Sequence, residues 1–230
     1  MFKRFYSAII AIIIFASIYN FNGCKDNALT PSLQENVTFG YISASDTVDH
    51  VGNLVLDTVK ILLKDIKLNG SGSDANFKTG PFVLNLSLPS LGVVNPVGSA
   101  YIVPGTYDKI KFEVHKLNSN ETVPDPEFID GNNSYSVVVK GTFNGNRFVF
   151  KSDKSANQIL NFPNALVVST TTTNVSLRIL PYIWFIDQNT GLYLDPNDPN
   201  VHNTIDNNIK DNIKGNFKAF KDDDKNGVPD

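Results

Sequence analysis

The feature that most constrains the fold of this chain is a series of short stretches in which apolar and polar residues alternate, separated by turn residues. The two clearest stretches, residues 134–142 and 146–151, flank Asn144-Gly145. Asn-Gly suits a two-residue type I′ turn, because both central residues of that turn need positive φ. Alternation puts every second side chain on the same face of a strand. The two stretches are therefore predicted to form a β-hairpin with one apolar face.

Other stretches of the same kind predict a chain that is mostly β. Further strands are expected at residues 36–43, 55–68 with a break near Asp65, 81–88, 101–103, 107–117, 157–162, 165–171, 174–180 and, past Pro181, 182–186. A helix is the competing interpretation of residues 54–66, but Thr58, Val59 and Ile61 favour a strand. Residues 69–76 (NGSGSDAN) are expected to form a flexible loop. Turn residues recur about every eight to twelve positions, and long βα repeats are absent. The predicted fold is an antiparallel β-sandwich, prealbumin- or Ig-like, over residues 36–200.

One amphipathic helix is predicted near the C-terminus, within residues 201–220. Apolar residues recur there every four positions: Ile205, Ile209, Ile213 and Phe217. They form one stripe, which suits a helix lying over an open end or edge of the sandwich. Asn203 or Thr204 is expected to cap its N-terminus.

The segment Pro104-Gly105-Thr106-Tyr107 predicts a type II turn, in which proline presets φ and glycine accepts positive φ. A Leu-rich strand and a short strand precede it, and an alternating strand follows. Together these features resemble an uncharacterised domain family of bacterial lipoproteins and, more loosely, prealbumin-like sandwiches. The resemblance spans residues 55–117. It implies a fold and carries over no catalytic residue.

The N-terminus predicts export from the cytosol. Two basic residues in Met1–Arg4 precede the apolar run 5–19, which is shorter than the roughly twenty residues needed to cross a bilayer. Cys24 is the only cysteine in the chain. Gly23-Cys24 resembles the end of a bacterial lipoprotein signal, with a loose lipobox of the kind common in the Bacteroidetes, because Phe21 and Asn22 depart from the usual residues.

The resemblance implies that residues 1–23 are a signal peptide, that Cys24 carries the lipid, and that residues 24–35 tether the folded part to the membrane. More than one acyl chain gives stable anchoring. Lys25-Asp26-Asn27 partly resembles the tag that directs such lipoproteins to the outer face, so the expected location is the outer membrane, exposed at the cell surface. The alternative is a signal cut elsewhere that leaves a free thiol.

Charge argues against nucleic acid as a partner. Removal of residues 1–23 takes away Lys3 and Arg4 and no acid, which leaves 18 basic and 23 acidic side chains and a net charge of −5. No basic run or basic-aromatic stripe is present to hold a phosphate backbone.

The acidic tail, residues 221–230, contains half of a calcium motif. Asp222, Asp224, Asn226 and Gly227 match D-x-D-x-N-G, in which alternating oxygens converge on one cation, and Asp230 stands at position 9. The segment is similar to the calcium repeats of thrombospondin-type proteins, although no acid occupies position 12. Two interpretations stay open: a weak Ca²⁺ site, or a solvated acidic tail.

Aromatic residues gather near Tyr182, where Trp184 and Tyr193 stand beside polar residues. Such a group can form a sugar-binding platform, with Tyr193 as the better candidate for stacking, or it can belong to the core. The histidines His50, His115 and His202 are far apart and are expected at the surface rather than at a metal.

These features predict a protein that is not an enzyme and acts by binding or assembly at the cell surface. Its expected partners are the membrane, through the lipid, and a polysaccharide or envelope protein. A fimbrial or matrix subunit joined by edge strands is one alternative. A hydrolase of envelope polysaccharides, with paired carboxylates from distant strands, is the other.

Overall fold

The computed structural model describes residues 33–43, 53–70, 72, 74–86, 88 and 92–230. The chain divides into two units, Met1–Gln34 and Glu35–Asp230, and almost all described residues belong to the second. The strands of the described residues are β1 (Val37–Ser43), β2 (Leu54–Asn69), β3 (Asp74–Leu86), β4 (Val94–Ala100), β5 (Gly105–Val114), β6 (Ile129–Asp130), β7 (Asn133–Ser134), β8 (Val137–Phe143), β9 (Asn146–Ser152), β10 (Ala156–Val168), β11 (Thr173–Ile179) and β12 (Lys218–Lys221). The helices are η2 (Pro126–Phe128), η3 (Pro181–Phe185) and α2 (His202–Asn216).

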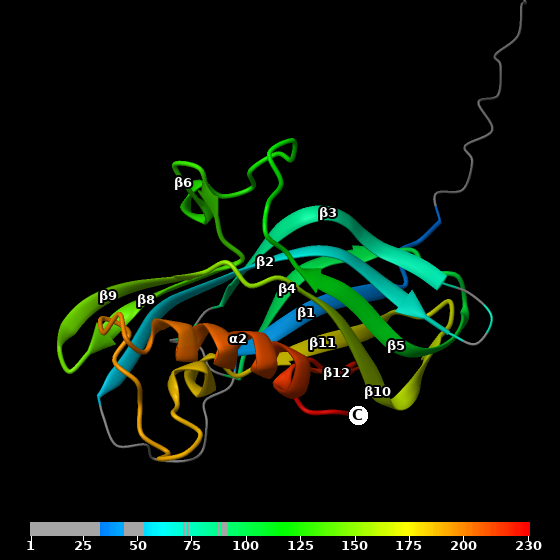
Figure 1. Cartoon of the computed structure of the whole chain (residues 1–230). Coiled ribbons are helices and arrows are strands. Elements are labelled where there is room, and N and C mark those ends of the chain that lie inside the picture. The colour runs from blue at the N-terminus through cyan, green and yellow to red at the C-terminus, as the bar shows by residue number, and fades with distance from the viewer. Residues whose placement is uncertain (1–32, 44–52, 71, 73, 87, 89–91) are drawn as a thin grey trace, which may run out of the picture. The chain divides into compact units, whose positions relative to one another are not determined.

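Within the described residues the strands form two large sheets that share one core (Figure 1). Sheet A has the strand order β12-β11-β1-β4. Sheet B has the order β10-β5-β2-β8-β9, and β3 also pairs with β2. The β6–β7 hairpin stands apart from both sheets in Figure 1. The prediction of a mostly β sandwich with one C-terminal α-helix is confirmed for this part of the chain.

The strand β2 is the centre of sheet B. One of its edges pairs with β3, and the other pairs first with β8 and then with β5. The change occurs at Leu62, whose amide donates to the Ser136 carbonyl at 2.8 Å and whose carbonyl accepts from the His115 amide at 2.9 Å. Asp65 adopts φ 54° where the register shifts, so the predicted break is a bulge in a continuous strand.

The core lies between the inner faces of the two sheets, where the alternation predicted from the sequence buries one side of each strand. Phe39 of β1 and Leu177 of β11 come from sheet A, and Ile61 of β2 and Phe112 of β5 come from sheet B. The Asn144-Gly145 turn has the predicted positive φ at both residues, 49° and 82°, which confirms the type I′ hairpin between β8 and β9.

A second, smaller core lies under the segment between β5 and β8. Leu62, Leu117, Phe128 and Val138 are buried together there. Outward-facing Leu62 and Val138 would meet water without this cover, so η2 and its neighbours close the outer face of sheet B at this point.

One strand pair departs from the antiparallel expectation. The strands β1 and β11 run parallel, with Val37 opposite Thr173 and Ser43 opposite Ile179. Parallel pairing needs a long connection, and here most of sheet B lies between the two strands in the sequence.

The C-terminal prediction needs correction. The helix α2 ends at Asn216, Phe217 is extended, and β12 then joins sheet A beside β11. The N-cap is Val201, which makes no side-chain cap bond, so neither Asn203 nor Thr204 caps the helix. The strand β12 makes the C-terminal segment part of the sandwich rather than an appendage to residues 36–200.

Three local predictions are also wrong. Gly105 opens β5 without positive φ, so the predicted type II turn is absent, and the buried Tyr107 instead ties this corner by donating from its hydroxyl to the Val103 carbonyl at 2.8 Å. The strand expected at residues 101–103 lies earlier, at β4. The segment expected as a strand past Pro181 is the 3₁₀ helix η3. The strand β4 was missed because it contains proline and glycine, which are uncommon inside strands. The proline that opens η3 favours a helical first turn.

Candidate functional site

The predicted calcium residues lie in a loop that follows β12 and folds back over the outer face of sheet A. Its anchor is Asp222, which is completely buried. Ser176 on β11 donates to Asp222 Oδ2 at 2.6 Å, and the Gly227 amide donates to the same oxygen at 3.2 Å. The interpretation of this segment as a solvated acidic tail is therefore wrong for Asp222.

Glycine is favoured at position 227 by its backbone conformation and by its close approach to β1. Its φ is +78°, and a Cβ there would collide with the Ile42 side chain of β1. Ile42 points to the outer face of sheet A yet is 4% exposed, because the loop covers it. The loop is thus packed onto the sandwich and held by Asp222.

The remaining predicted ligands lie on the exposed side of the loop. Asp224 accepts from the Asn226 amide at 3.1 Å and from Asn226 Nδ2 at 2.7 Å, while Asn226 Oδ1 accepts from the Val228 amide at 2.7 Å. Asp230 Oδ2 accepts from the Asp223 amide at 2.8 Å. Hydrogen bonds within the loop therefore hold these polar side chains in place without a bound ion.

One carboxylate oxygen each from Asp222, Asp224 and Asp230 lies within 4.8 Å of the other two. Three such oxygens suit a hard cation such as Ca²⁺, which takes six to eight oxygen ligands. A competing cation is already present, because Lys221 Nζ lies 3.1 Å from Asp230 Oδ2. The Asp223 amide and Lys221 together lower the pKa of Asp230, so its carboxylate stays ionised and available as a ligand.

A groove of about 360 Å³ runs beside this loop on the outer face of sheet A. Both apolar and polar residues line it, from β1, β4, β11 and the loop, among them Thr38, Val94, Pro96, Asn174, Ser176 and Lys225. Ser176 and Asn174 also hold the loop, through Asp222 and Asp223 respectively. Loop and groove are therefore parts of one surface, and sequence reasoning missed the groove because its residues come from four separate segments.

The predicted sugar-binding platform is not formed as expected. Trp184 is 1% exposed and belongs to the main core, so its ring has no face for a sugar. Tyr193 is partly buried and packs against the same core. The core interpretation of this aromatic group is the correct one for Trp184.

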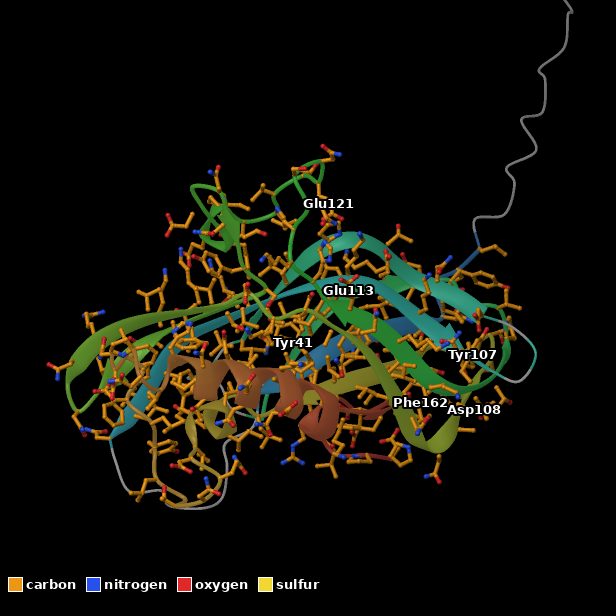
Figure 2. All side chains as sticks on the ribbon, viewed as in Figure 1. Tyr41, Tyr107, Asp108, Glu113, Glu121 and Phe162 are labelled. Carbon is orange, nitrogen blue, oxygen red and sulfur yellow. The ribbon has the colours of Figure 1, made fainter. Side chains whose placement is uncertain are left out.

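His115 is buried, at 3% exposure, although a surface position was expected. Its Nδ1 lies 3.0 Å from Glu113 and its Nε2 lies 2.6 Å from Glu121, and both glutamates are labelled in Figure 2. Lys64 Nζ lies 2.6 Å from the other oxygen of Glu121. Hydrogen bonds from the Asn118 amide, Lys64 and His115 lower the pKa of Glu121 to about 2. This cluster fixes the segment after β5 to sheet B.

His202 belongs to no group of possible metal ligands among the described residues. His202 is exposed at the start of α2, where its ring packs near Phe150 with centroids 4.6 Å apart. His50, Cys24 and the predicted signal peptide lie outside the described residues, as does most of the tether. Among the described helices, none is long and apolar enough to cross a membrane.

Comparisons with protein families, curated proteins and solved structures found no match to this chain.

Proposed function

We propose that this protein is a lipoprotein of the cell envelope that acts by binding at the cell surface and not by catalysis. The observation that carries the binding proposal is the groove beside the C-terminal loop, because a recess with a largely apolar lining and a few polar groups is typical of ligand sites. The compact unit begins at Glu35, shortly after Cys24, which suits a folded body held close to a lipid anchor.

The anchoring part is tested at Cys24. Cells that produce the wild-type chain or Cys24→Ser are treated with an inhibitor of lipoprotein signal peptidase, and the N-terminus is identified by mass spectrometry. Wild type is expected to start at an acylated Cys24, and the inhibitor or the substitution is expected to leave the precursor. An unmodified mature N-terminus at another residue would refute the anchor.

The calcium motif belongs to the same proposal, since the loop forms one wall of the groove. Ca²⁺ is expected to bind weakly, because Lys221 competes for Asp230 and only three carboxylates lie close together. Calorimetric titration of the full chain in detergent should show heat for wild type, less for Asp224→Asn, and an unchanged signal for the control Asp211→Asn on α2. Absence of heat in wild type would remove calcium from the proposal.

Assembly through edge strands is the second candidate. The edge strand β10 favours it in part, because Ala156–Val168 carries no charged residue and exposes Ile159 and Val167, although Pro163 removes one amide donor from this strand. The edge strands β4 and β9 oppose it, since β4 contains Pro96 and β9 carries Arg147 and Lys151. Crosslinking on intact cells should give monomers for a binding module, whereas a ladder of multimers would favour the fimbrial or matrix alternative.

A further inference from the structure

A group of lysines lies together on the outer face of sheet B. Lys67 of β2 lies directly opposite Lys111 of β5, and Lys109 lies two residues along β5 on the same face. These three residues are called the cationic face below. Among the described residues, no acid forms an ion pair with any of them.

Carboxylates beside the cationic face have other partners. Glu113 contacts His115, Glu121 of the following segment is paired with Lys64, and Asp65 accepts a backbone amide at 2.8 Å. Like charges directly opposite on paired strands destabilise a sheet. Such an arrangement gives this face a local positive charge that an anion from outside can neutralise.

The neighbours of the cationic face suit a sugar better than a lipid. Asn76 of β3 lies opposite Lys67, and Asn161 of β10 lies opposite Lys109. Both asparagines are exposed, and each amide can donate to and accept from a hydroxyl. A recess of about 390 Å³ lies beside Lys67 and Lys111, and Lys64, Asn157 and Ile159 also line it, together with the carboxylates Asp65 and Glu113. Ile159 is the exposed large apolar residue of this recess, which offers little to insert into a bilayer.

We propose that the cationic face binds an acidic polysaccharide, through carboxylates held by Lys67, Lys109 and Lys111 and hydroxyls held by the flanking asparagines. This inference rests on the proposed position at the cell surface, where such polymers occur. It names a ligand class and a site distinct from the groove on sheet A.

The test uses the full chain in detergent and polygalacturonate as the probe, with uncharged dextran as the control polymer. Wild type is expected to bind polygalacturonate, more weakly as salt rises, and not to bind dextran. Each exposed ion pair contributes about 0.2–1 kcal/mol. Lys67→Gln with Lys111→Gln is therefore expected to weaken binding by about twofold to thirtyfold. The matched control, Lys210→Gln with Lys218→Gln, removes the same charge elsewhere and should leave binding unchanged.

Lys67→Glu separates binding from stability. It places a carboxylate opposite Lys111, so the unfolding midpoint should rise while affinity for polygalacturonate falls. Equal binding to dextran, no loss in the double variant, or binding only to vesicles of anionic lipid would each overturn the proposal. Anchoring is judged separately. An acylated protein that does not bind polygalacturonate refutes only the proposed role of the cationic face, and an unacylated protein that binds it refutes only the proposed anchor.

Discussion

At the scale of single residues, the most informative positions are those where a side chain has a role that its type does not suggest. Asp222 is a buried anchor rather than a solvated acid, and His115 is held between two glutamates rather than exposed. The D-x-D-x-N-G pattern correctly placed the acids close together, because the spacing and the glycine act locally. The burial of Asp222 depends on Ser176 and on the packing of the loop against Ile42, which are far away in the sequence.

Gly227→Ala is expected to destabilise the fold by about 1–3 kcal/mol, because it adds a Cβ at positive φ and pushes it into Ile42. Gly191→Ala is the matched control, since Gly191 also has positive φ, +71°, but has open space around its Cβ position. The difference in unfolding free energy by urea denaturation measures the collision. Equal losses in the two variants would mean that the loop does not press on Ile42.

The low pKa of Glu121 leads us to expect that the free energy of unfolding depends on pH. Its pKa is about 2 in the folded state against an ordinary value of 4.5, so its contribution is present above about pH 4.5 and is lost as pH falls towards 2. Glu121→Gln should therefore lower stability at neutral pH and flatten the loss of stability between pH 5 and pH 2. Urea denaturation at several pH values checks this. An unchanged slope would show that another carboxylate dominates.

At the scale of elements, periodicity identified most segments and misjudged their ends. The four-residue repeat in α2 buries Ile205, Ile209 and Ile213 completely, as an amphipathic stripe should. The fourth member, Phe217, stacks on Phe112 with centroids 6.2 Å apart although it lies beyond the helix. A side chain at the right interval can thus reach the core from extended backbone, so the repeat alone could not show where the helix ended.

Ile209→Ala should cost about 2–5 kcal/mol in unfolding free energy, because the side chain is fully buried in the main core. Asn203→Ala should cost less than about 0.5 kcal/mol, because Asn203 is exposed and does not cap the helix. Denaturation of the two variants by urea tests both statements. A loss near 1 kcal/mol for Asn203→Ala would restore its role as a cap.

At the scale of the folded unit, Glu35–Asp230, the C-terminal segment completes sheet A. The strand β12 pairs with β11, and the loop after it covers Ile42. The parallel pairing of β1 with β11 places the first and one of the last strands of this unit side by side. Both ends of the unit therefore contribute to one sheet.

Truncation after Lys221 is expected to lower the free energy of unfolding by about 2 kcal/mol or more, because it exposes Ile42 and removes Asp222 from Ser176. Thermal unfolding of the truncated and full chains measures the loss. Calcium should have no effect on the truncated chain. An unchanged midpoint would show that the loop does not support sheet A.

The sequence by itself determined the elements whose causes are local. Alternation of apolar and polar residues predicted the strands β1, β2, β5, β8 and β9, and Asn144-Gly145 predicted the hairpin between the last two. The spacing of the acids predicted that their carboxylates lie close together in the loop. Only the tertiary structure decided the parallel partner of β1, the existence of β4 and β12, and the burial of Trp184 and Asp222. It also decided that Lys67 lies opposite Lys111. All of these features depend on contacts between segments far apart in the chain, which no local pattern encodes.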